Sequence, residues 1–328
     1  MKNVGITGIG SYVPEKIVSN FELEKMVDTS DEWIRTRTGI SYRRTAEKDV
    51  TASDLGTLAG KTALSRAGIS PENVDLIIVA SATPDMIFPS TACIIQYKIG
   101  ATRAAAVDIQ AGCTGFIYAL TCAEQFLIAG MYENVLIIGT EVLSRIVDWE
   151  DRNTCVLFGD GAGAAVVSHV EGNGILASIL GADGSGSELL TLPAGASKEP
   201  ASIQTVLNRR HYVKMNGNEV FKFAVKIVEE ATLQVAEKAK ISLDEITHFI
   251  PHQANIRIID AAIKRLGISK DKVVVNLQNY GNMSSASIPV ALDEAYSEGR
   301  IKKGDKVVMV GFGAGLTWGA NIVEWSMS

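Results

Sequence analysis

Two stretches of this chain carry one pattern at one separation, and this repeat limits the folds that the chain can adopt. The segment AGISPENVDLIIVASAT (67–83) aligns without gaps on AKISLDEITHFIPHQAN (239–255), so that position 67 corresponds to position 239. Further along, VLIIG (135–139) aligns on VVMVG (307–311) at the same offset. Helix, turn and apolar strand are common patterns, so coincidence is the alternative. The equal offset favours two duplicated halves.

Short apolar runs alternate with helical patterns along the chain. The predicted strands are 74–82, 134–140, 164–170 and 306–312, and the predicted helices are 51–68, 115–130, 217–240 and 255–267. Continuous apolar runs of this length are typical of strands that are buried on both faces. Because 328 residues exceed the usual size of one hydrophobic core, we predict one large α/β domain or two closely packed halves.

Composition excludes several classes of protein. The four cysteines show no metal-ligand spacing, so we expect neither a zinc site nor a disulfide framework. The N-terminal segment does not resemble a signal peptide, and no apolar run reaches the roughly 20 residues that span a bilayer. A net charge of −6 argues against general binding to nucleic acid. We therefore expect a cytoplasmic protein with no membrane or nucleic-acid partner.

One cysteine stands where a predicted strand gives way to a predicted helix. The segment DIQAGCTGFIYAL (108–120) places Cys113 between Gly112 and the pair Thr114 and Gly115. These small neighbours allow a sharp turn and the approach of a bulky acyl group. Unpaired amides at a helix N-terminus lower the pKa of a thiol, which favours the reactive thiolate. Cys113 is therefore a candidate nucleophile, and the alternative is a small buried apolar residue.

Two further residues could act with this cysteine. His252, in IPHQANIRI, follows a predicted strand and precedes a predicted helix, which is the edge where α/β proteins build their sites. We interpret the other three histidines as structural. Asn282, in NYGNMSSASIP, occupies a turn that is equivalent to the turn of Cys113 if the halves are duplicated. Asparagine beside glycine is also ordinary turn chemistry, which is the alternative.

The glycine-rich segment FGDGAGAAVV (158–167) is similar to a phosphate-binding loop. Such loops open a helix, whereas the residues that follow here, AAVVSHV, predict a strand. We therefore interpret these glycines as a tight turn beside the site.

Several motifs together resemble the β-ketoacyl-acyl-carrier-protein synthase III family. They are TSDEWIRTRTGI (29–40), QAGCTGF (110–116), WEDRNTCVLFGDGAGAAVV (149–167), IPHQANIRI, NYGNMSSASIP and GFGAGLTWG (311–319). The resemblance runs from the first predicted strand to the last few residues. It implies the thiolase fold, an α/β fold with duplicated halves in five αβαβα layers, and a homodimer. Residues 1–173 would form the half with the cysteine, and residues 174–328 the half with the histidine and asparagine.

The resemblance also implies a condensing acyltransferase that initiates fatty acid synthesis. Cys113, as a thiolate, would attack a short acyl-CoA, and the backbone amides of Cys113 and Ala314 would hold the oxyanion. Malonyl-acyl-carrier protein would then lose carbon dioxide, and its enolate would attack the acyl-enzyme. His252, as a neutral imidazole, and Asn282 would donate hydrogen bonds to the malonyl thioester oxygen. No metal or resident cofactor is implied, because acyl-CoA is a substrate.

The same resemblance assigns residues around the catalytic group. Trp33 and Arg152 would hold the CoA adenine, and Arg37 would meet the phosphates. Gly217, Asn218 and Phe221 would line the pantetheine tunnel. Phe312 would border the acyl pocket beside the cysteine. A basic face that would steer the acidic carrier protein consists of Lys222, Arg257, Lys264 and Arg265. The alternatives are surface residues without a ligand and a solvated helix face.

Two residues depart from the family pattern. Ala314 stands where glycine is frequent, and Met283 stands where threonine is usual. Neither change removes a catalytic group, but both bear on the acyl chain that the site accepts.

Four alternative functions remain open at this stage. Two are a priming synthase or acyltransferase of secondary metabolism and a catalytically silent acyl-CoA-binding protein. A third is a cysteine acyl-hydrolase. A relative that forms hydroxymethylglutaryl-CoA would need a glutamate base, and the sequence shows no matching glutamate setting. The presence of Cys113, His252 and Asn282 together favours the condensing enzyme, because binding CoA requires none of the three.

Residues 193–212 show no clear periodic pattern. We predict a loop over the tunnel there, and we expect it to be the most mobile part of the chain.

Overall fold

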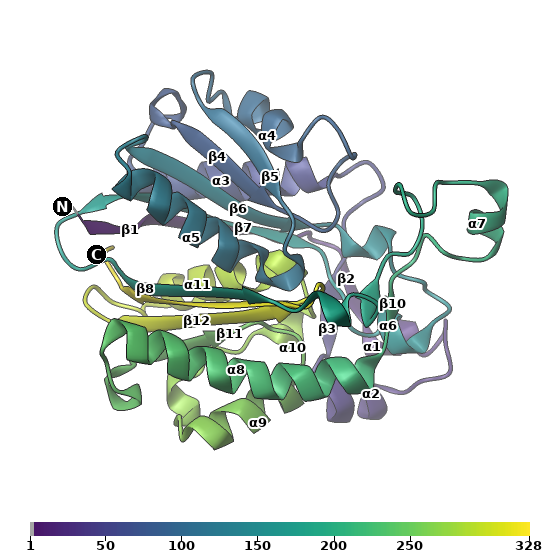
Figure 1. The fold of residues 1–328 in the computed structure, drawn as a ribbon. Helices are drawn as coiled ribbons and strands as arrows, with labels where there is room; N and C mark the ends of the chain where they lie inside the picture. The colour runs from purple at the N-terminus through teal and green to yellow at the C-terminus, as the bar shows by residue number, and fades with distance from the viewer. Residues whose placement is uncertain (1–2) are drawn as a thin grey trace.

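Two β-sheets form the framework of the protein in the computed structural model, which describes residues 3–328 (Figure 1). The larger sheet contains, in spatial order, β1 (Asn3–Tyr12), β7 (Gly161–Val170), β6 (Asn134–Glu141), β4 (Leu76–Ala80) and β5 (Ala105–Ile109). The smaller sheet contains β8 (Ile175–Ala182), β13 (Thr317–Glu324), β12 (Lys306–Gly313) and β11 (His248–Pro251). Each sheet combines parallel and antiparallel pairs.

Three layers of helices enclose the sheets and separate them (Figure 1). The outer layers are α3 (Ala52–Ala67) with α4 (Thr91–Ile99), and α8 (Gly217–Ala239) with α9 (Ile256–Leu266). The middle layer consists of α5 (Gly115–Ile128) and α11 (Ser287–Ser297). Helix α5 contacts both sheets, which explains why it is apolar on more than one face. None of the helices within residues 3–328 is long and apolar enough to cross a membrane.

The shorter elements gather at one end of the sheets (Figure 1). Two small antiparallel pairs are β2 (Ile17–Ser19) with β3 (Tyr42–Arg44), and β9 (Leu190–Thr191) with β10 (Lys214–Met215). The short helices are α1 (Asn20–Leu23), α2 (Asp31–Thr38), α6 (Arg152–Cys155), α7 (Ile203–Leu207) and α10 (Leu277–Tyr280). These elements surround the residues that the sequence marks as functional.

The two halves repeat each other at the predicted offset. Four pairs of elements begin at positions separated by the offset that relates position 67 to position 239. These pairs are β1 and β8, β4 and β11, β6 and β12, and α5 and α11. Strand order also matches, because β1-β7-β6-β4 corresponds to β8-β13-β12-β11. In the smaller sheet, an isolated bridge between Phe249 and Val273 stands where the larger sheet has β5. The chain is therefore duplicated; the boundary between residues 173 and 174 lies between β7 and β8 and stays a prediction.

Two glycines of the glycine-rich segment 158–167 lie in a strand rather than in a turn. Gly161 and Gly163 lie inside β7, so the predicted tight turn is wrong there. A Cβ atom at Gly161 would lie 2.6 Å from the sulfur of Met283, and one at Gly163 would lie 2.6 Å from Pro289. These glycines therefore allow the chain around the start of α11 to pack directly on the strand.

Residues 193–212 contain a helix, α7, where the sequence predicted only a loop. The segment forms a lobe at the edge of the molecule (Figure 1), and Arg209 pairs with Asp148 while Arg210 pairs with Glu199. Residues 190–192 and 213, which flank this segment, line one of the cavities near Cys113. The lobe therefore adjoins the site, and its mobility stays a prediction.

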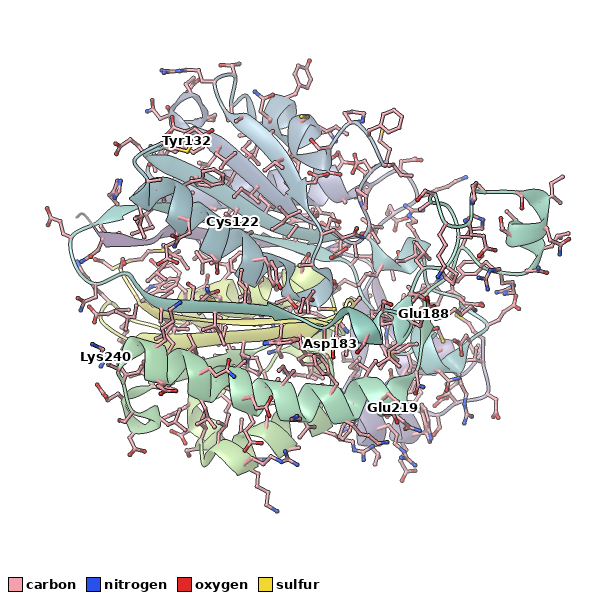
Figure 2. All side chains as sticks on the ribbon, viewed as in Figure 1. Cys122, Tyr132, Asp183, Glu188, Glu219 and Lys240 are labelled. Atoms are coloured by element: carbon pink, nitrogen blue, oxygen red, sulfur yellow. The ribbon has the colours of Figure 1, made fainter. Side chains whose placement is uncertain are left out.

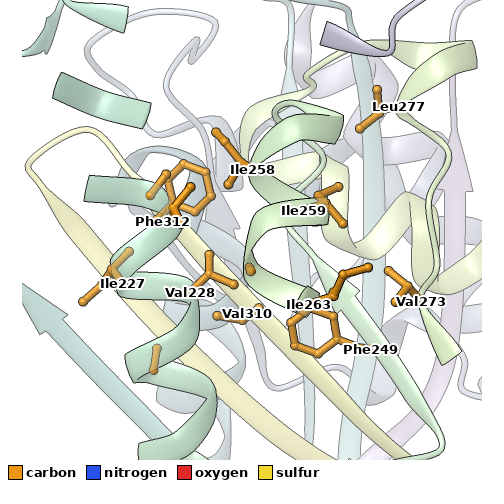
Figure 3. Close-up of a cluster of buried hydrophobic side chains, with 14 of the residues drawn as sticks. Ile227, Val228, Phe249, Ile258, Ile259, Ile263, Val273, Leu277, Val310 and Phe312 are labelled. Atoms are coloured by element: carbon orange, nitrogen blue, oxygen red, sulfur yellow. The ribbon is translucent and has the colours of Figure 1, made fainter. Parts of the chain in front are cut away.

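A buried apolar cluster joins α8 and α9 to the smaller sheet (Figure 3). Ile227 and Val228 come from α8, Ile259 and Ile263 from α9, and Phe249 from β11. The spacing of four residues on α9 places its side chains on one face of the helix. Charged side chains at the two ends of α8, such as Glu219 and Lys240, point to solvent (Figure 2).

Phe249→Ala should lower the free energy of unfolding by about 3–5 kcal/mol, because Phe249 is fully buried and its loss leaves a cavity. Phe21→Ala is the matched control, since Phe21 is 62% exposed; it should cost about 0.5 kcal/mol or less. Urea unfolding of both variants measures the difference, and equal losses would contradict the assigned core.

Candidate active site

Three connected hollows lead from the surface to Cys113. The inner one, of about 150 Å³, is lined by Cys113, His252 and Asn282. The outer one, of about 860 Å³, shares Gly217 and Phe221 with the inner one and opens to solvent. The third, of about 400 Å³, lies at Cys113 and is lined mainly by apolar residues, among them Leu143, Ile146, Leu190, Leu192 and Val213. A ligand could therefore extend from the surface past Cys113 into an apolar pocket.

The turn that carries Cys113 packs backbone against backbone on the end of β12. Cys113 lies in a short 3₁₀ turn, Gly112–Thr114, which precedes α5, and Gly112 has a φ of 51°. A Cβ atom at Gly112 would lie 2.9 Å from the nitrogen of Ala314, and one at Gly313 would lie 2.5 Å from the nitrogen of Cys113. Glycine at both positions therefore lets the two backbones pack closely, so that the backbone nitrogens of Cys113 and Ala314 lie near each other beside the sulfur.

Cys113 is a neutral thiol in the free protein, contrary to the prediction of a lowered pKa. Burial raises the pKa of the Cys113 thiol to about 12, and a hydrogen bond from Ser284 opposes this shift only in part. The prediction is wrong because removing the sulfur from water outweighs the partial charges of a few amides. The thiol must therefore lose its proton as it reacts.

His252 is fixed between β11 and α9 as a neutral imidazole. Its backbone N–H donates to the carbonyl of Val310 at 2.8 Å, and its ring packs edge-on against Phe312 with centroids 5.3 Å apart. Burial lowers the pKa of His252 to about 3. Near neutral pH the ring therefore carries one N–H donor and one acceptor nitrogen.

Asn282 is held by the chain on both sides of it. Its backbone N–H donates to the carbonyl of Leu157 at 2.8 Å, and its carbonyl accepts from the N–H of Gly159 at 3.0 Å. Its side-chain Oδ1 accepts from the N–H of Ser284 at 2.8 Å. Ser284 has a φ of 46°, which is uncommon for a residue with a side chain. Because Oδ1 is occupied, Nδ2 is the group that Asn282 can offer to a ligand.

The outer hollow gathers the residues expected to bind CoA. Its lining includes Trp33, Arg37, Gly217, Asn218 and Phe221. Arg152 lies beside it, with its guanidinium carbon 5.1 Å from the ring centroid of Trp33. This is the distance of a cation–π contact.

The inner hollow is lined by Phe312, and the third hollow is lined by Ala314. All residues expected to touch the substrate therefore lie in or beside one continuous path.

The four expected carrier-protein residues are exposed but divide into two places. Lys222 lies in the first turns of α8 and pairs with Glu219, and Arg257 lies 5.5 Å above the ring of Phe221 at the opening. Lys264 and Arg265 lie seven and eight residues further along α9, about 10–12 Å away along the helix axis. The structure therefore brings only the first pair to the mouth of the path.

Two residues near Cys113 were not found from the sequence. Glu141 is fully buried at the end of β6, and Ser284 lies in the turn after Asn282. One feature of the sequence could have indicated Glu141: it is a charged residue at the end of the strand NVLIIGTE, whose central residues are apolar. Glu141 is the glutamate near the cysteine that the sequence did not reveal, and Ala82, Thr83 and Ser285 bind its carboxyl group.

His252 should stay neutral in the folded protein down to about pH 4, because burial lowers its pKa to about 3. Below pH 6.5 the unfolded chain binds a proton at this residue that the folded chain does not, so stability falls as the pH falls. Nitrogen NMR of the His252 ring at pH 5 should report a neutral imidazole in the folded protein and mostly imidazolium in urea. A charged ring in the folded protein at pH 5 would contradict this assignment.

Comparison with known proteins gives relatives over the full chain. The family model for 3-oxoacyl-[acyl-carrier-protein] synthase III matches residues 107–184, and the model for its C-terminal part matches residues 236–325. A protein of Caldanaerobacter subterraneus subsp. tengcongensis named beta-ketoacyl-[acyl-carrier-protein] synthase III is 60% identical over 98% of both chains. A protein of the same name from Desulfitobacterium hafniense is 56% identical over 99% of both.

Solved structures agree with these relatives. The 3-oxoacyl-[acyl-carrier-protein] synthase III of Aquifex aeolicus is 50% identical, covers 98% of this chain and 100% of its own, and superposes with a TM-score of 0.91. The priming beta-ketosynthase of the R1128 polyketide pathway is 36% identical over 99% of this chain and 97% of its own, with a TM-score of 0.92. The thiolase-like fold predicted from the sequence is confirmed. The chain belongs to the β-ketoacyl-acyl-carrier-protein synthase III family of condensing acyltransferases.

Proposed function

We propose that this protein condenses a short acyl-CoA with malonyl-acyl-carrier protein and so initiates fatty acid synthesis. The observation that carries the proposal is the inner hollow, where Cys113, His252 and Asn282 meet although they come from three separate segments. A nucleophile and two hydrogen-bond donors at the end of a long path suit transfer of an acyl group from a long thioester.

Acyl transfer comes first. The sulfur of Cys113 attacks the thioester carbon of acyl-CoA while the thiol proton leaves, the carbon–sulfur bond to CoA breaks, and CoA departs as its thiol. The backbone N–H groups of Cys113 and Ala314 stabilise the oxyanion that forms on the way. The third hollow receives the acyl chain, because its lining is mainly apolar.

Condensation follows on the acyl-enzyme. Malonyl-acyl-carrier protein loses carbon dioxide, and the electrons of the broken bond form an enolate. A neutral His252 and the Nδ2 group of Asn282 donate to the enolate oxygen, and a donor of this kind is typically worth about 2.7–4 kcal/mol. The enolate carbon then attacks the acyl carbon, the carbon–sulfur bond to Cys113 breaks, and the released thiolate takes up a proton from water to restore the thiol. This sequence uses no resident cofactor.

Recognition of the two carriers uses the outer hollow and its rim. Trp33 and Arg152 provide flat and cationic surfaces for the adenine, and Arg37 provides charge for the phosphates. Lys222 and Arg257 meet the acidic carrier protein at the opening, and Lys264 and Arg265 extend the positive charge along α9. The free thiols of the described cysteines suit a reducing compartment, which supports the cytoplasm as its location.

A homodimer is also part of this proposal. Strand β5 is the edge of the larger sheet, so one row of its backbone groups has no partner strand within the described chain. Val107 on this strand is 42% exposed, and the nearby loop exposes Ile87 by 76% and Phe88 by 82%. Pairing of two β5 strands about a two-fold axis would cover both the edge and the apolar side chains.

A double variant, Phe88→Asp with Val107→Asp, should therefore shift the protein from dimer to monomer in analytical ultracentrifugation, because charges would replace apolar contacts. Leu233→Asp is the matched control, since Leu233 is 46% exposed on α8 in the opposite outer layer. A wild-type protein that sediments as a monomer would refute the dimer.

For the catalytic proposal, incubation with acetyl-CoA or isobutyryl-CoA should add one acyl group to Cys113, detected by intact and peptide mass spectrometry. Cys113→Ala should give no adduct. His252→Ala and Asn282→Ala should keep the adduct but lose condensation by about 10²–10³-fold each, because each removes one donor to the enolate. His211→Ala is the matched control, since His211 lies in the lobe.

The other outcomes separate the alternatives. No adduct with any short acyl-CoA would indicate a silent binding protein. An adduct lost only to water would indicate a hydrolase, and condensation with only a different carrier protein would indicate a synthase of secondary metabolism.

A further inference from the structure

Glu141 is the buried charged residue for which the proposed mechanism gives no role. It is fully buried, and no lysine or arginine within residues 3–328 forms an ion pair with it. Its Oε2 atom accepts from the N–H of Ala82 at 3.0 Å and from the hydroxyl of Thr83 at 2.8 Å. Its Oε1 atom lies 2.8 Å from the hydroxyl of Ser285. A buried carboxylate without a cation is costly, so its protonation state needs an explanation.

The hydroxyl groups around Glu141 decide which oxygen carries a proton. Thr83 accepts from the N–H of Val142 at 2.8 Å, so its own proton points to Oε2 of Glu141. Ser285 has one hydroxyl proton but lies near two acceptors, the carbonyl of Ala80 at 2.9 Å and Oε1 of Glu141 at 2.8 Å. If Glu141 is ionised, the single Ser285 proton must be shared between the two acceptors. Two full hydrogen bonds form if Ser285 donates to Ala80 and a protonated Oε1 donates to Ser285.

The remaining contacts of the carboxyl group agree with this count. The hydroxyl of Ser81 lies 3.4 Å from Oε2, and the N–H groups of Ala82 and Ser285 lie 3.2 and 3.3 Å from Oε1. A carboxylic hydroxyl at Oε1 keeps lone pairs that can accept these long contacts. Burial also raises the pKa of Glu141. The titratable group that faces it is Cys113, from the turn before α5. The contacts from residues 81–83, which follow β4, and from residues 284–285 are hydroxyls and amides.

The internal repeat shows why this acid matters to the cysteine. Ser285 is the repeat equivalent of Cys113, and Gly313 is the repeat equivalent of Glu141, because both pairs are separated by the offset that relates the two halves. In one half the turn of Cys113 packs on Gly313, and in the other half the turn of Ser285 packs on the end of β6 at Glu141. The two turns meet at Ser284, which lines the same hollow as Cys113. The Ser284 side chain lowers the pKa of both Cys113 and Glu141.

We propose that Glu141 is a positioning residue that is held as an uncharged carboxylic acid beside Cys113. It anchors the turn 284–286, and through the N–H of Ser284 it orients Asn282. It does so without placing a negative charge next to the sulfur, where such a charge would oppose formation of the thiolate. The inference rests on the proposed role of Cys113 as nucleophile.

Glu141→Gln tests the protonation state directly. The amide N–H of glutamine donates to Ser285 as the carboxylic hydroxyl does, and its carbonyl accepts from Ala82 and Thr83. The new amide nitrogen would also face the N–H groups of Ala82 and Ser285, but at 3.2 and 3.3 Å, which are long contacts. The melting temperature should therefore stay within about 2 °C of the wild type.

Asp160→Asn is the matched control. Asp160 is equally buried but accepts from the N–H groups of Ala46 at 2.7 Å and Ser144 at 2.8 Å. An amide nitrogen there would face an amide donor, so its melting temperature should fall by more than about 5 °C. A fall as large for Glu141→Gln, or failure of that variant to fold, would overturn the proposal.

A second measurement reports on the cysteine without any acyl-CoA. The rate of alkylation of Cys113 by iodoacetamide at pH 7–8, read by peptide mass spectrometry, follows its thiolate fraction. An uncharged Glu141 predicts a rate for Glu141→Gln within about fivefold of the wild type. A larger increase would show that the glutamine relieves a negative charge, which would overturn the proposal.

The positioning role has its own test in condensation. Glu141→Gln should keep condensation within about threefold, whereas Glu141→Ala, which removes the anchor of the turn, should lose at least about 30-fold while Cys113 still accepts an acyl group. Equal activity of the two variants would overturn the positioning role. If acylation itself fails in the wild type, the proposed function falls, while the thermal and alkylation results still decide the state of Glu141.

Discussion

The close contact between the turn of Cys113 and the end of β12 is the constraint on which the rest of the site depends. Two glycines, Gly112 and Gly313, let the backbones approach to distances that no Cβ atom would tolerate. This contact joins the two halves and brings the nitrogens of Cys113 and Ala314 together. The five layers of helices and sheets hold the two turns at this distance, because α5 and α11 are packed between the sheets.

Burial then sets the chemistry of each group. Removal from water raises the pKa of the Cys113 thiol and lowers the pKa of His252, so both groups are neutral at rest. In the proposed reaction, charge therefore develops only when a thioester is present and the amides and the two donors can stabilise it. A resting site without net charge also suits the apolar pocket next to the sulfur.

Much of the fold could be predicted because it depends on local pattern and on the repeat. The constant offset between the halves anticipated that β11 and β12 correspond to β4 and β6, and the predicted helices agree with α3, α5, α8 and α9 within a few residues. The predictions failed where packing partners are distant in sequence. Gly161 and Gly163 lie in a strand because α11 and the turn before it press on β7, and no local signal shows that contact.

The sequence by itself determined the order of elements, the duplication, the membership of the family and the three residues of the inner hollow. Only the tertiary structure decided the protonation of Cys113, the separation of Lys264 from the tunnel mouth, and the position of Glu141 under the turn of Ser284. The physical reason is that motif and periodicity are properties of neighbouring residues. Desolvation and hydrogen-bond partners depend on segments that only folding brings together.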